Sequence, residues 1–257
     1  MSETHLPAEQ TLTGRQPVLE ALKARQALEK IYLQHGSSGP VIQQIREFAR
    51  ERGVPVSEVD RDRIRQLAGD APAQGVVALL ESVPYAELDE LLAVAHRRNE
   101  PPFLLVLDEI EDPHNLGALI RTAECAGVHG VVIPKHHAAA ITPTVVKASA
   151  GAVSHLSIAR VTNIASCLDE LKTSGLWIVG TAAEGDRRYS EHDYRGPLAV
   201  VIGSEGRGMR RLVHEKCDFV VSIPLYGKVG SLNASVAGAV VLFEAARSRH
   251  AGAKTQR

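Results

Sequence analysis

The sequence predicts an α/β protein in two parts: a small N-terminal α/β domain and a larger C-terminal domain built on a mostly parallel sheet. Short, continuously apolar runs alternate with helical segments, a pattern typical of parallel strands that helices cover on both faces. The pattern is interrupted at residues 84–100, where Pro84 precedes a polar helical segment and Pro101 follows it. Two domains joined by a linker are therefore expected, with disordered ends at residues 1–10 and 251–257.

The first part, residues 11–83, is expected to form a compact domain without a catalytic cluster of its own. Its apolar spacing predicts a helix around 18–22, a strand at 30–33, a helix over 41–49, and strands at 54–56 and 75–80. Gly53 stands where a C-terminal helix cap belongs. Several arginines could contact phosphate, although nearby acidic residues make a solvated surface an equal interpretation. They are Arg46, Arg50, Arg52, Arg61, Arg63 and Arg65.

The second part, residues 101–250, alternates between strand and helix more regularly. Strands are expected at 103–107, 130–133, 156–161, 177–180, 198–202 and 219–223. Ligands of open parallel sheets bind in loops beyond the carboxyl ends of the strands. The candidate functional loops are therefore those that follow Leu107, Gly180, Ile202 and Ile223.

Composition limits the function classes. The chain has 257 residues, 44% of them hydrophobic, and a net charge of −1, which argues mildly against an extended basic surface for nucleic acid. From Pro101 onward, however, 17 Lys and Arg stand against 15 Asp and Glu. A local basic patch can bind phosphate on a neutral protein, and a salt-bridged surface is the equal alternative. The arginines that cluster are Arg187, Arg188, Arg195, Arg207, Arg210 and Arg211.

The sequence favours a cytoplasmic protein without a membrane segment or a metal. The longest apolar stretch, residues 234–243, is half of the roughly 20 residues that a membrane helix needs, and the N-terminus has no secretory pattern. The three cysteines are scattered, which favours buried thiols over a disulfide or zinc site. The histidines His129, His136 and His137 are expected to be ordinary surface or loop residues.

The first motif, LDEIEDPHNLGALIRTAECAGV at residues 107–128, takes a strand through an acidic turn into a helix. The helix has an apolar stripe at i, i+3, i+4 and i+7, formed by Leu116, Leu119, Ile120 and Ala123. Asn115 and Arg121 lie off this stripe and are candidates for chemistry. The alternatives are a helix cap for Asn115 and a surface ion pair with Glu124 for Arg121.

The second motif, VIGSEGRGM at residues 201–209, ends a strand in three glycines, which allow tight turns and close approach to a ligand. Glu205 stands between them and could reach a site; the alternative is a solvated turn residue. The Gly-x-x-Gly-x-Gly spacing differs from a dinucleotide fingerprint, and the chain has no Gly-Lys-Ser/Thr loop, which argues against a P-loop ATPase.

The third motif, IPLYGKVGSLNASVAGAVVLFEAAR at residues 223–247, joins a strand to a long helix through a glycine-containing loop. Ser231 and Asn233 stand at the helix entry, where backbone N–H groups lack partners, so plain capping is the alternative to a role in chemistry. A buried stripe is expected at Leu232, Val236, Val240 and Phe243. The small residues that permit close helix packing are Ala234, Ala237, Gly238 and Ala239.

Together the three segments resemble the three motifs of the SpoU (TrmH) family of RNA ribose methyltransferases, within the SPOUT superfamily. The resemblance spans about 150 residues in order, and KASAGAVSHLSIARVTNI at residues 147–164 fits it as well. The N-terminal GRQPVLEAL, residues 14–22, resembles the substrate-binding domain of the subgroup that methylates a guanosine ribose in 23S rRNA.

The resemblance implies a C-terminal trefoil knot, a homodimer, and S-adenosylmethionine as methyl donor for 2′-O-methylation of RNA, with 23S rRNA or a ribosomal precursor particle as partner. By motif position it implies a catalytic set of Asn115, Arg121, Glu205, Ser231 and Asn233. The implied cofactor-binding set is Thr181, Gly203, Ile223 and Leu232.

Chemistry refines one of these roles and leaves three alternatives. Arg121 is a donor that stays protonated, so it suits stabilising a developing alkoxide and binding the adjacent phosphate better than removing a proton. The alternatives are a tRNA 2′-O-methyltransferase, an rRNA methylase that confers antibiotic resistance, and a non-catalytic RNA-binding or ribosome-assembly protein.

Overall fold

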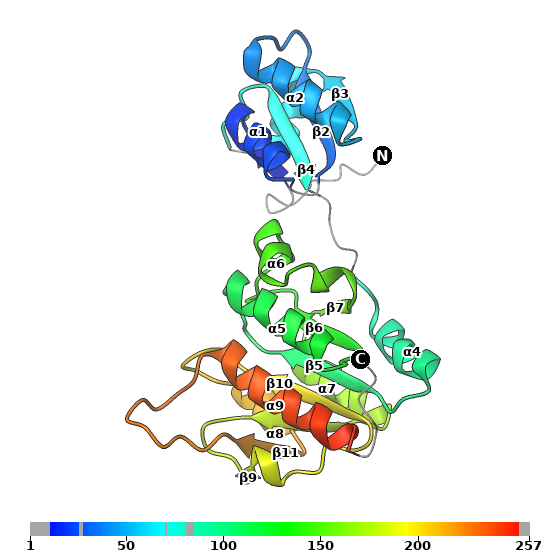
Figure 1. The fold of residues 1–257 in the computed structure, drawn as a ribbon, viewed down its shortest axis with the longest axis vertical. Coiled ribbons are helices and arrows are strands. Elements are labelled where there is room, and N and C mark those ends of the chain that lie inside the picture. The colour runs from blue at the N-terminus through cyan, green and yellow to red at the C-terminus, as the bar shows by residue number, and fades with distance from the viewer. Residues whose placement is uncertain (1–10, 26–27, 70, 81–84, 252–257) are drawn as a thin grey trace. The chain divides into compact units, whose positions relative to one another are not determined.

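The computed structural model describes residues 11–25, 28–69, 71–80 and 85–251. The chain divides into two compact units, residues 1–83 and 84–257, each shown as a ribbon in Figure 1. The predicted disordered N-terminus lies outside the described residues, as do residues 252–257 of the predicted tail. None of the helices in the described ranges is long and apolar enough to cross a membrane.

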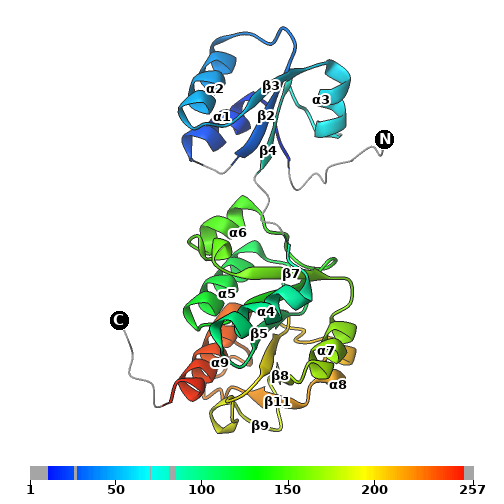
Figure 2. The same ribbon diagram turned by 90° about the vertical axis from the view of Figure 1, so that its right-hand side faces the viewer.

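The first unit is a four-stranded sheet with helices on both faces (Figure 2). Its described elements are β1 (Thr11–Thr13), α1 (Arg15–Lys23), β2 (Leu28–Gln34), α2 (Pro40–Glu51), β3 (Val56–Val59), α3 (Arg61–Ala68) and β4 (Val76–Leu80). The strand order is β1-β4-β2-β3, and only β2 and β3 run parallel. Alternate residues of β4 face opposite ways: Val76 packs in the core under α1 and α2, and Val77 packs under α3.

The second unit confirms the predicted parallel sheet. Its strands are β5 (Phe103–Leu107), β6 (Gly130–Pro134), β7 (Ser157–Val161), β8 (Trp177–Thr181), β9 (Arg187–Arg188), β10 (Leu198–Ile202) and β11 (Phe219–Ser222). They lie in the order β7-β6-β5-β10-β8-β11-β9, and every neighbouring pair is parallel. The sequence located the apolar strands to within one residue at most ends but missed the short β1 and β9, and it placed β3 two residues early.

Helices cover both faces of this sheet because its strands are apolar on both sides (Figure 1). The helices are α4 (Leu88–Arg98), α5 (Pro113–Cys125), α6 (Pro143–Ala148), α7 (Ile164–Thr173), α8 (Arg211–Lys216) and α9 (Ala234–Arg249), with 3-10 turns η2 (Ala152–Ser154) and η3 (Tyr189–Glu191). Residues of α4, α7 and α8 share one core cluster with Leu104 and Val106 of β5. α5 packs against α6 and α9.

The prediction of a linker at residues 84–100 is wrong for the described part of that segment. α4 has a capping box of Glu87 and Glu90, packs against β6 and β7, and buries Leu91 fully. Ala86 also forms a bridge with Ala159 at the end of the sheet. The polar composition of this helix reflects its outer face, so the helix belongs to the second unit.

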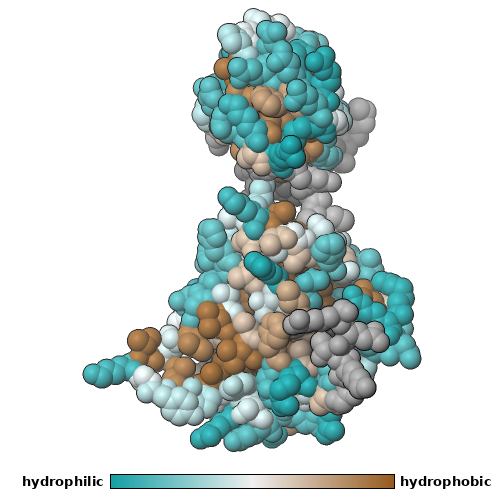
Figure 3. Space-filling model, in the orientation of Figure 1, coloured by the Kyte–Doolittle hydropathy of each residue, from teal (hydrophilic) through white to brown (hydrophobic). Residues whose placement is uncertain are grey.

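The prediction of which residues form the buried stripe of α9 is wrong. None of Leu232, Val236, Val240 and Phe243 is buried, and the side chains of Val236 and Phe243 are about half exposed, at 49% and 52%. The side that faces the core instead carries Ala234, Gly238, Val241, Leu242 and Ala245. Hydrophobic residues gather on the surface over the start of α9 and the segment that precedes it (Figure 3).

Two smaller expectations are also wrong. His129 is buried, and both of its ring nitrogens have partners there. Nδ1 accepts from the backbone N–H of Phe103 at 3.0 Å, and Nε2 lies 2.9 Å from Glu100. Burial lowers the pKa of His129, against the opposing effect of Glu100. Cys125 is exposed, whereas Cys167 is buried; all three cysteines are free thiols.

Candidate active site

The site lies at the carboxyl ends of the strands where the sheet order reverses. From β5 the chain adds β6 and β7 on one side, and β10 later pairs with β5 on the other side. β8, β10 and β11 are neighbours in the sheet and end at one edge. Thr181, Gly203 and Ile223, at or just after these ends, therefore line the same edge, as ligand loops of open α/β sheets do.

The loop after β10 requires glycine. Ser204 and Gly208 exchange backbone hydrogen bonds of 3.0 and 2.9 Å, which folds the loop into a small hairpin with Glu205 near its tip. Gly206 and Gly208 adopt positive φ values of 81° and 69°. A Cβ on Gly203 would lie 2.2 Å from the backbone carbon of Gly208, so a side chain there would push the loop open.

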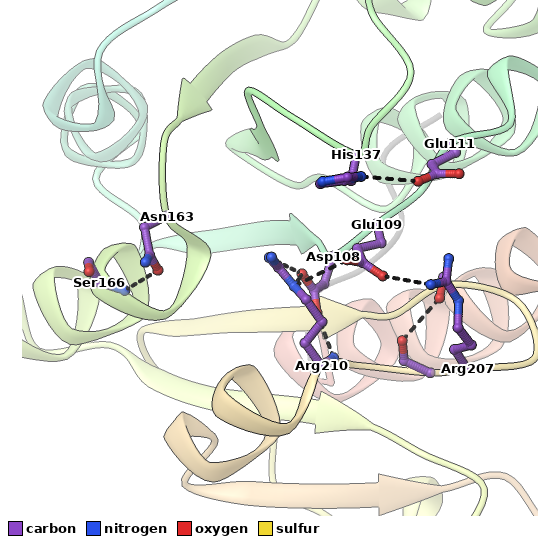
Figure 4. A network of polar contacts seen from close by, with 10 residues as sticks. Asp108, Glu109, Glu111, His137, Asn163, Ser166, Arg207 and Arg210 are labelled. Atoms are coloured by element: carbon purple, nitrogen blue, oxygen red, sulfur yellow. Dashed lines mark hydrogen bonds and ion pairs between the residues drawn. The ribbon is translucent and has the colours of Figure 1, made fainter.

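An ion pair between the buried carboxylate of Asp108 and the partly exposed Arg210 holds the C-terminal end of this loop. Asp108 follows β5, is 0% exposed, and accepts from Arg210 Nε at 2.8 Å, Arg210 Nη2 at 2.6 Å and the Arg210 backbone N–H at 2.8 Å (Figure 4). The hydrogen bond with Asp108 raises the pKa of Arg210. Glu109 adds longer contacts with Arg210 and Arg207, of 3.7 and 3.8 Å.

Sequence reasoning missed Asp108 and considered Arg210 only as part of a basic patch. The available signal was a carboxylate directly after a fully apolar strand, at the edge where ligands bind. The pair spans 102 residues, so nothing local in the sequence predicts which arginine Asp108 meets.

Three of the predicted catalytic residues meet at the starts of α5 and α9. Asn233 Nδ2 donates to Asn115 Oδ1 and to Glu205 Oε2, both at 2.9 Å. These three residues come from the three separate motifs, and we call them the polar cluster. The helices can approach this closely because Gly238 of α9 has no Cβ. A Cβ there would lie only 2.4 Å from Leu119 of α5.

The capping alternatives have different outcomes for the two asparagines. Asn233 does cap α9, since its Oδ1 accepts from the N–H of Ser235 at 2.9 Å and of Val236 at 3.4 Å. Asn115 is not the cap of α5: Asp112 is, accepting from the N–H groups of His114 and Asn115. The side chain of Asn115 therefore contributes to the polar cluster and does not cap the helix.

The other predicted site residues stand apart from this cluster. Arg121 is exposed on α5, and among the described residues no hydrogen bond or ion pair joins it to Glu124 or to the polar cluster. Ser231 is exposed and Leu232 is half-buried in the segment that leads into α9. The catalytic and cofactor roles of the nine residues remain predictions at this point.

No group of three or more His, Cys, Asp or Glu side chains in the described ranges could hold a metal ion.

A family model described as the SpoU rRNA Methylase family matches residues 102–243, more than half of the chain. The chain belongs to this family. A second model, described as RNA 2′-O ribose methyltransferase substrate binding, matches residues 11–86. The SpoU family member described here is thus an RNA methyltransferase with an N-terminal substrate-binding domain, which confirms the resemblance seen in the sequence.

Relatives match over nearly the full length. A TrmH family tRNA/rRNA methyltransferase of Bacillus subtilis (strain 168), YacO, is 47% identical over 237 residues, covering 92% of this chain and 95% of the relative. A TrmH family tRNA/rRNA methyltransferase of Staphylococcus saprophyticus is 44% identical over 239 residues, covering 93% and 96%.

Solved SpoU structures share the fold. AviRb of Streptomyces viridochromogenes, in complex with the cofactor AdoMet, matches with a TM-score of 0.63 and 27% identity over 94% of this chain and 91% of that one. An AdoMet-bound rRNA methyltransferase of Sinorhizobium meliloti matches with a TM-score of 0.59 and 27% identity over 93% and 87%.

Proposed function

We propose that this SpoU protein transfers a methyl group from S-adenosylmethionine to the ribose 2′-hydroxyl of a guanosine in 23S rRNA. The observation that carries the proposal is the polar cluster: Asn115, Glu205 and Asn233 come from three distant segments and meet beside the loops that end β8, β10 and β11. Such convergence serves a reacting group, because capping of α9 alone would need only Asn233.

The loops at this edge fit S-adenosylmethionine. Thr181, Gly203, Ile223 and Leu232 provide backbone groups, small side chains and apolar surface without a charge, which suits an adenine and its ribose. The cofactor bound in the AviRb and Sinorhizobium meliloti structures supports the same donor here. When bound, it supplies an electrophilic sulfonium methyl group.

We assign the roles of the polar-cluster residues from which of their side-chain atoms already have hydrogen-bond partners. Both amide hydrogens of Asn233 are used, on Asn115 and Glu205, so Asn233 is a positioning residue. Among described residues no partner is recorded for Asn115 Nδ2 or Glu205 Oε1. These two atoms can reach the substrate, and Glu205 Oε1 is the acceptor for the hydrogen bond of the attacking hydroxyl.

Arg121 completes the proposed catalytic set as a charge stabiliser. Its guanidinium donates only, so it binds the phosphate beside the target ribose and the oxygen on which negative charge develops. The absence of a recorded partner among described residues leaves that guanidinium available. Ser231, in the exposed segment before α9, is proposed to contact the ribose as well.

The proposed assembly is a homodimer. A helix that is apolar on two sides needs two partners, and α9 buries one side in the core while Val236 and Phe243 remain about half exposed. Leu225, Tyr226 and Val229, in the segment before α9, extend the exposed apolar surface. Exposed patches of this kind mark association sites, and a second copy is the proposed partner because two-fold dimers are the commonest assembly.

Ribosomal RNA, free or in a precursor particle, is favoured over tRNA by domain organisation, and such a substrate places the protein in the cytoplasm. The Sinorhizobium meliloti rRNA enzyme matches 93% of this chain, including the first unit. The Aquifex aeolicus TrmH/SpoU tRNA modifying enzyme matches 63%, although 84% of its own length is covered. The Bacillus subtilis relative is named a tRNA/rRNA methyltransferase, so tRNA is the second candidate.

Methylation of defined RNAs tests the proposal. The protein is incubated with labelled S-adenosylmethionine and unmodified 23S rRNA, tRNA or ribosomal precursor particles, and the digested nucleosides are identified by mass spectrometry. We expect 2′-O-methylguanosine from 23S rRNA or its particle only. Label in tRNA or on another nucleoside would overturn the substrate, and no label in any RNA would favour a binding-only protein.

Variants test the site within the same assay. Glu205→Gln keeps the shape and the hydrogen bond to Asn233 but removes the charge, and we expect turnover to fall by about 100-fold or more. Glu215→Gln is the matched control, because Glu215 is exposed and pairs with Arg211 in α8, its one side-chain partner in the described part of the chain. Equal turnover in the two variants would remove Glu205 from the mechanism.

A further inference from the structure

A cavity of about 810 Å³ opens in the first unit, and all its described lining residues belong to that unit. One face of α3 lines it, with Arg61, Ile64, Arg65 and Ala68 at helical spacing. The segment 34–38 after β2 and the segment 71–75 before β4, with Arg15, form the rest of the described lining. The volume is that of a site for a nucleotide-sized ligand.

The lining is positively charged. Arg15, Arg61 and Arg65 contribute guanidinium groups and His35 an imidazole, and no described lining residue is Asp or Glu. The nearest acidic side chain on β3, Glu58, is engaged by Arg46 at 2.5 Å and by His35 at 3.3 Å. The described part of the cavity therefore attracts anions.

The three arginines differ in what already holds them. Arg15 joins the two loops, because its Nε donates to Gln74 O at 3.1 Å and its Nη1 to Ser38 O at 3.3 Å. Arg61 and Arg65 are exposed, and neither side chain has a hydrogen bond or ion pair with another described residue. Arg15 thus shapes the rim, while Arg61 and Arg65 have donors free for a ligand.

Backbone geometry keeps the loops close together. Gly75 has a φ of +76°, and a Cβ there would lie 3.0 Å from Ser37 Oγ and 3.3 Å from Gln34 Cβ. Gln34 N–H donates to Gly75 O at 2.8 Å, which ties the ends of the two loops. The rim is therefore a built feature, with glycine required where the loops meet.

We propose that this cavity holds a ribose-phosphate segment of the RNA substrate, with Arg61 and Arg65 as the phosphate ligands and Arg15 as the residue that positions the rim. Arg61 and Arg65 are four residues apart, about 6 Å along the helix, so each can contact a different phosphate. The inference rests on the proposed function in taking the ligand to be RNA. A free nucleoside phosphate shares the chemistry, and the experiment separates the two sources.

The test compares single variants on one helix. Arg61→Gln and Arg65→Gln remove a lining charge each, and Arg63→Gln is the matched control, because Arg63 bonds Gln66 and does not line the cavity. Binding of the full chain to a labelled single-stranded RNA oligonucleotide is measured by fluorescence anisotropy at several salt concentrations. This measurement does not require catalysis, so its failure is distinct from failure of the proposed function.

We expect Arg61→Gln and Arg65→Gln each to weaken RNA binding by about tenfold and to reduce the slope of log K against log salt by about 0.7. In methylation assays they should raise KM for RNA and leave kcat unchanged, because neither arginine belongs to the polar cluster. Arg63→Gln should change none of these. The thermal shift produced by S-adenosylmethionine should be the same in all three.

Two results would overturn the inference. Equal RNA affinity and salt slope in Arg61→Gln, Arg65→Gln and Arg63→Gln would remove the cavity from RNA binding. The second arm adds guanosine monophosphate alone: saturable binding that depends on Arg61 and Arg65, with RNA affinity unchanged in the variants, would assign the cavity to a free nucleotide instead.

Discussion

Replacing Asp108 by Asn is expected to destabilise the second unit and to slow methyl transfer. The Asp108 side chain is fully buried and accepts three hydrogen bonds from Arg210, two from the guanidinium and one from the backbone. Asparagine keeps the volume, but it removes the charge and presents an NH₂ group to donors. At least one bond is lost, and among the described residues Glu109, at 3.7 Å, is then the guanidinium's remaining charged partner.

The magnitude follows from the burial of each partner. A hydrogen bond to a charged group contributes about 1.5–3 kcal/mol. The Arg210 side chain is 44% exposed, so water compensates part of the loss, and a value toward the lower end, about 2 kcal/mol, is expected. For a unit of this size about 1 kcal/mol corresponds to about 2–4 °C, which gives a fall in Tm of about 4–8 °C.

Urea unfolding and thermal unfolding measure the effect, with Arg211→Gln as the control. Arg211 is adjacent in sequence, and its pair with Glu215 is exposed on both sides, so its loss should matter far less. A double-mutant cycle of Asp108→Asn with Arg210→Gln should show a coupling of about 1 kcal/mol or more. A coupling near zero, or equal losses in Asp108→Asn and Arg211→Gln, would refute the reasoning.

Activity should fall beyond what stability explains. Arg210 ends the loop that begins at Gly203 and carries Glu205, so loosening this loop should displace the acceptor that we propose for the ribose hydroxyl. We expect kcat to fall at temperatures where the variant is still folded, because small misplacement of a reacting group is costly.

Three further outcomes are expected. Asn233→Asp keeps the oxygen that caps α9, but it cannot donate to Glu205 and it places a second carboxylate beside that residue. Stability should therefore change little, whereas methyl transfer should be lost. Retained turnover would contradict the positioning role of Asn233. Gly203→Ala should abolish the thermal shift given by S-adenosylmethionine, since its Cβ would meet the Gly208 backbone at 2.2 Å; a normal shift would show that the loop can yield. Burial lowers the pKa of His129, so the unfolded chain, with a histidine pKa of about 6.5, binds the proton more readily, and stability should fall as pH drops below about 6.5. The difference between the urea midpoints at about pH 7.5 and 5.5 should therefore be smaller in His129→Gln. An unchanged difference would exclude His129 as the cause.

The parallel sheet was predictable because its strands are apolar on both faces. Runs such as 103–107 and 198–202 are fully buried, and their ends in the structure coincide with the ends of the apolar runs. β9 was not predictable, since its two residues, Arg187 and Arg188, are exposed and pair with β11 at the sheet edge. A strand without a buried face leaves no alternation to detect.

The polar cluster was predictable as a set of residues but not as a geometry. Motif order indicated Asn115, Glu205 and Asn233, whereas the contact between the two asparagines depends on the approach of α5 and α9 at Gly238, and the contact with Glu205 depends on the fold of the loop after β10. The same limit explains why Asp108 was missed. A buried carboxylate and its arginine are recognised only when residues far apart in sequence meet.

The error on α9 carries more information than the successes. Counting apolar residues at i, i+4, i+8 and i+11 selected Leu232, Val236, Val240 and Phe243, but small residues occupy the opposite side, and small residues are what allow α9 to approach α5. Close approach buries Gly238 together with Val241 and Leu242, and it leaves Val236 and Phe243 outward. Burying Val236 and Phe243 as well would stabilise the protein, because large apolar side chains contribute most on burial. The outward Val236 and Phe243 are therefore best explained by a second partner, and replacing Phe243 by Asp should convert a homodimer into monomers in sedimentation experiments. A protein that sediments as a monomer before the substitution would remove this explanation.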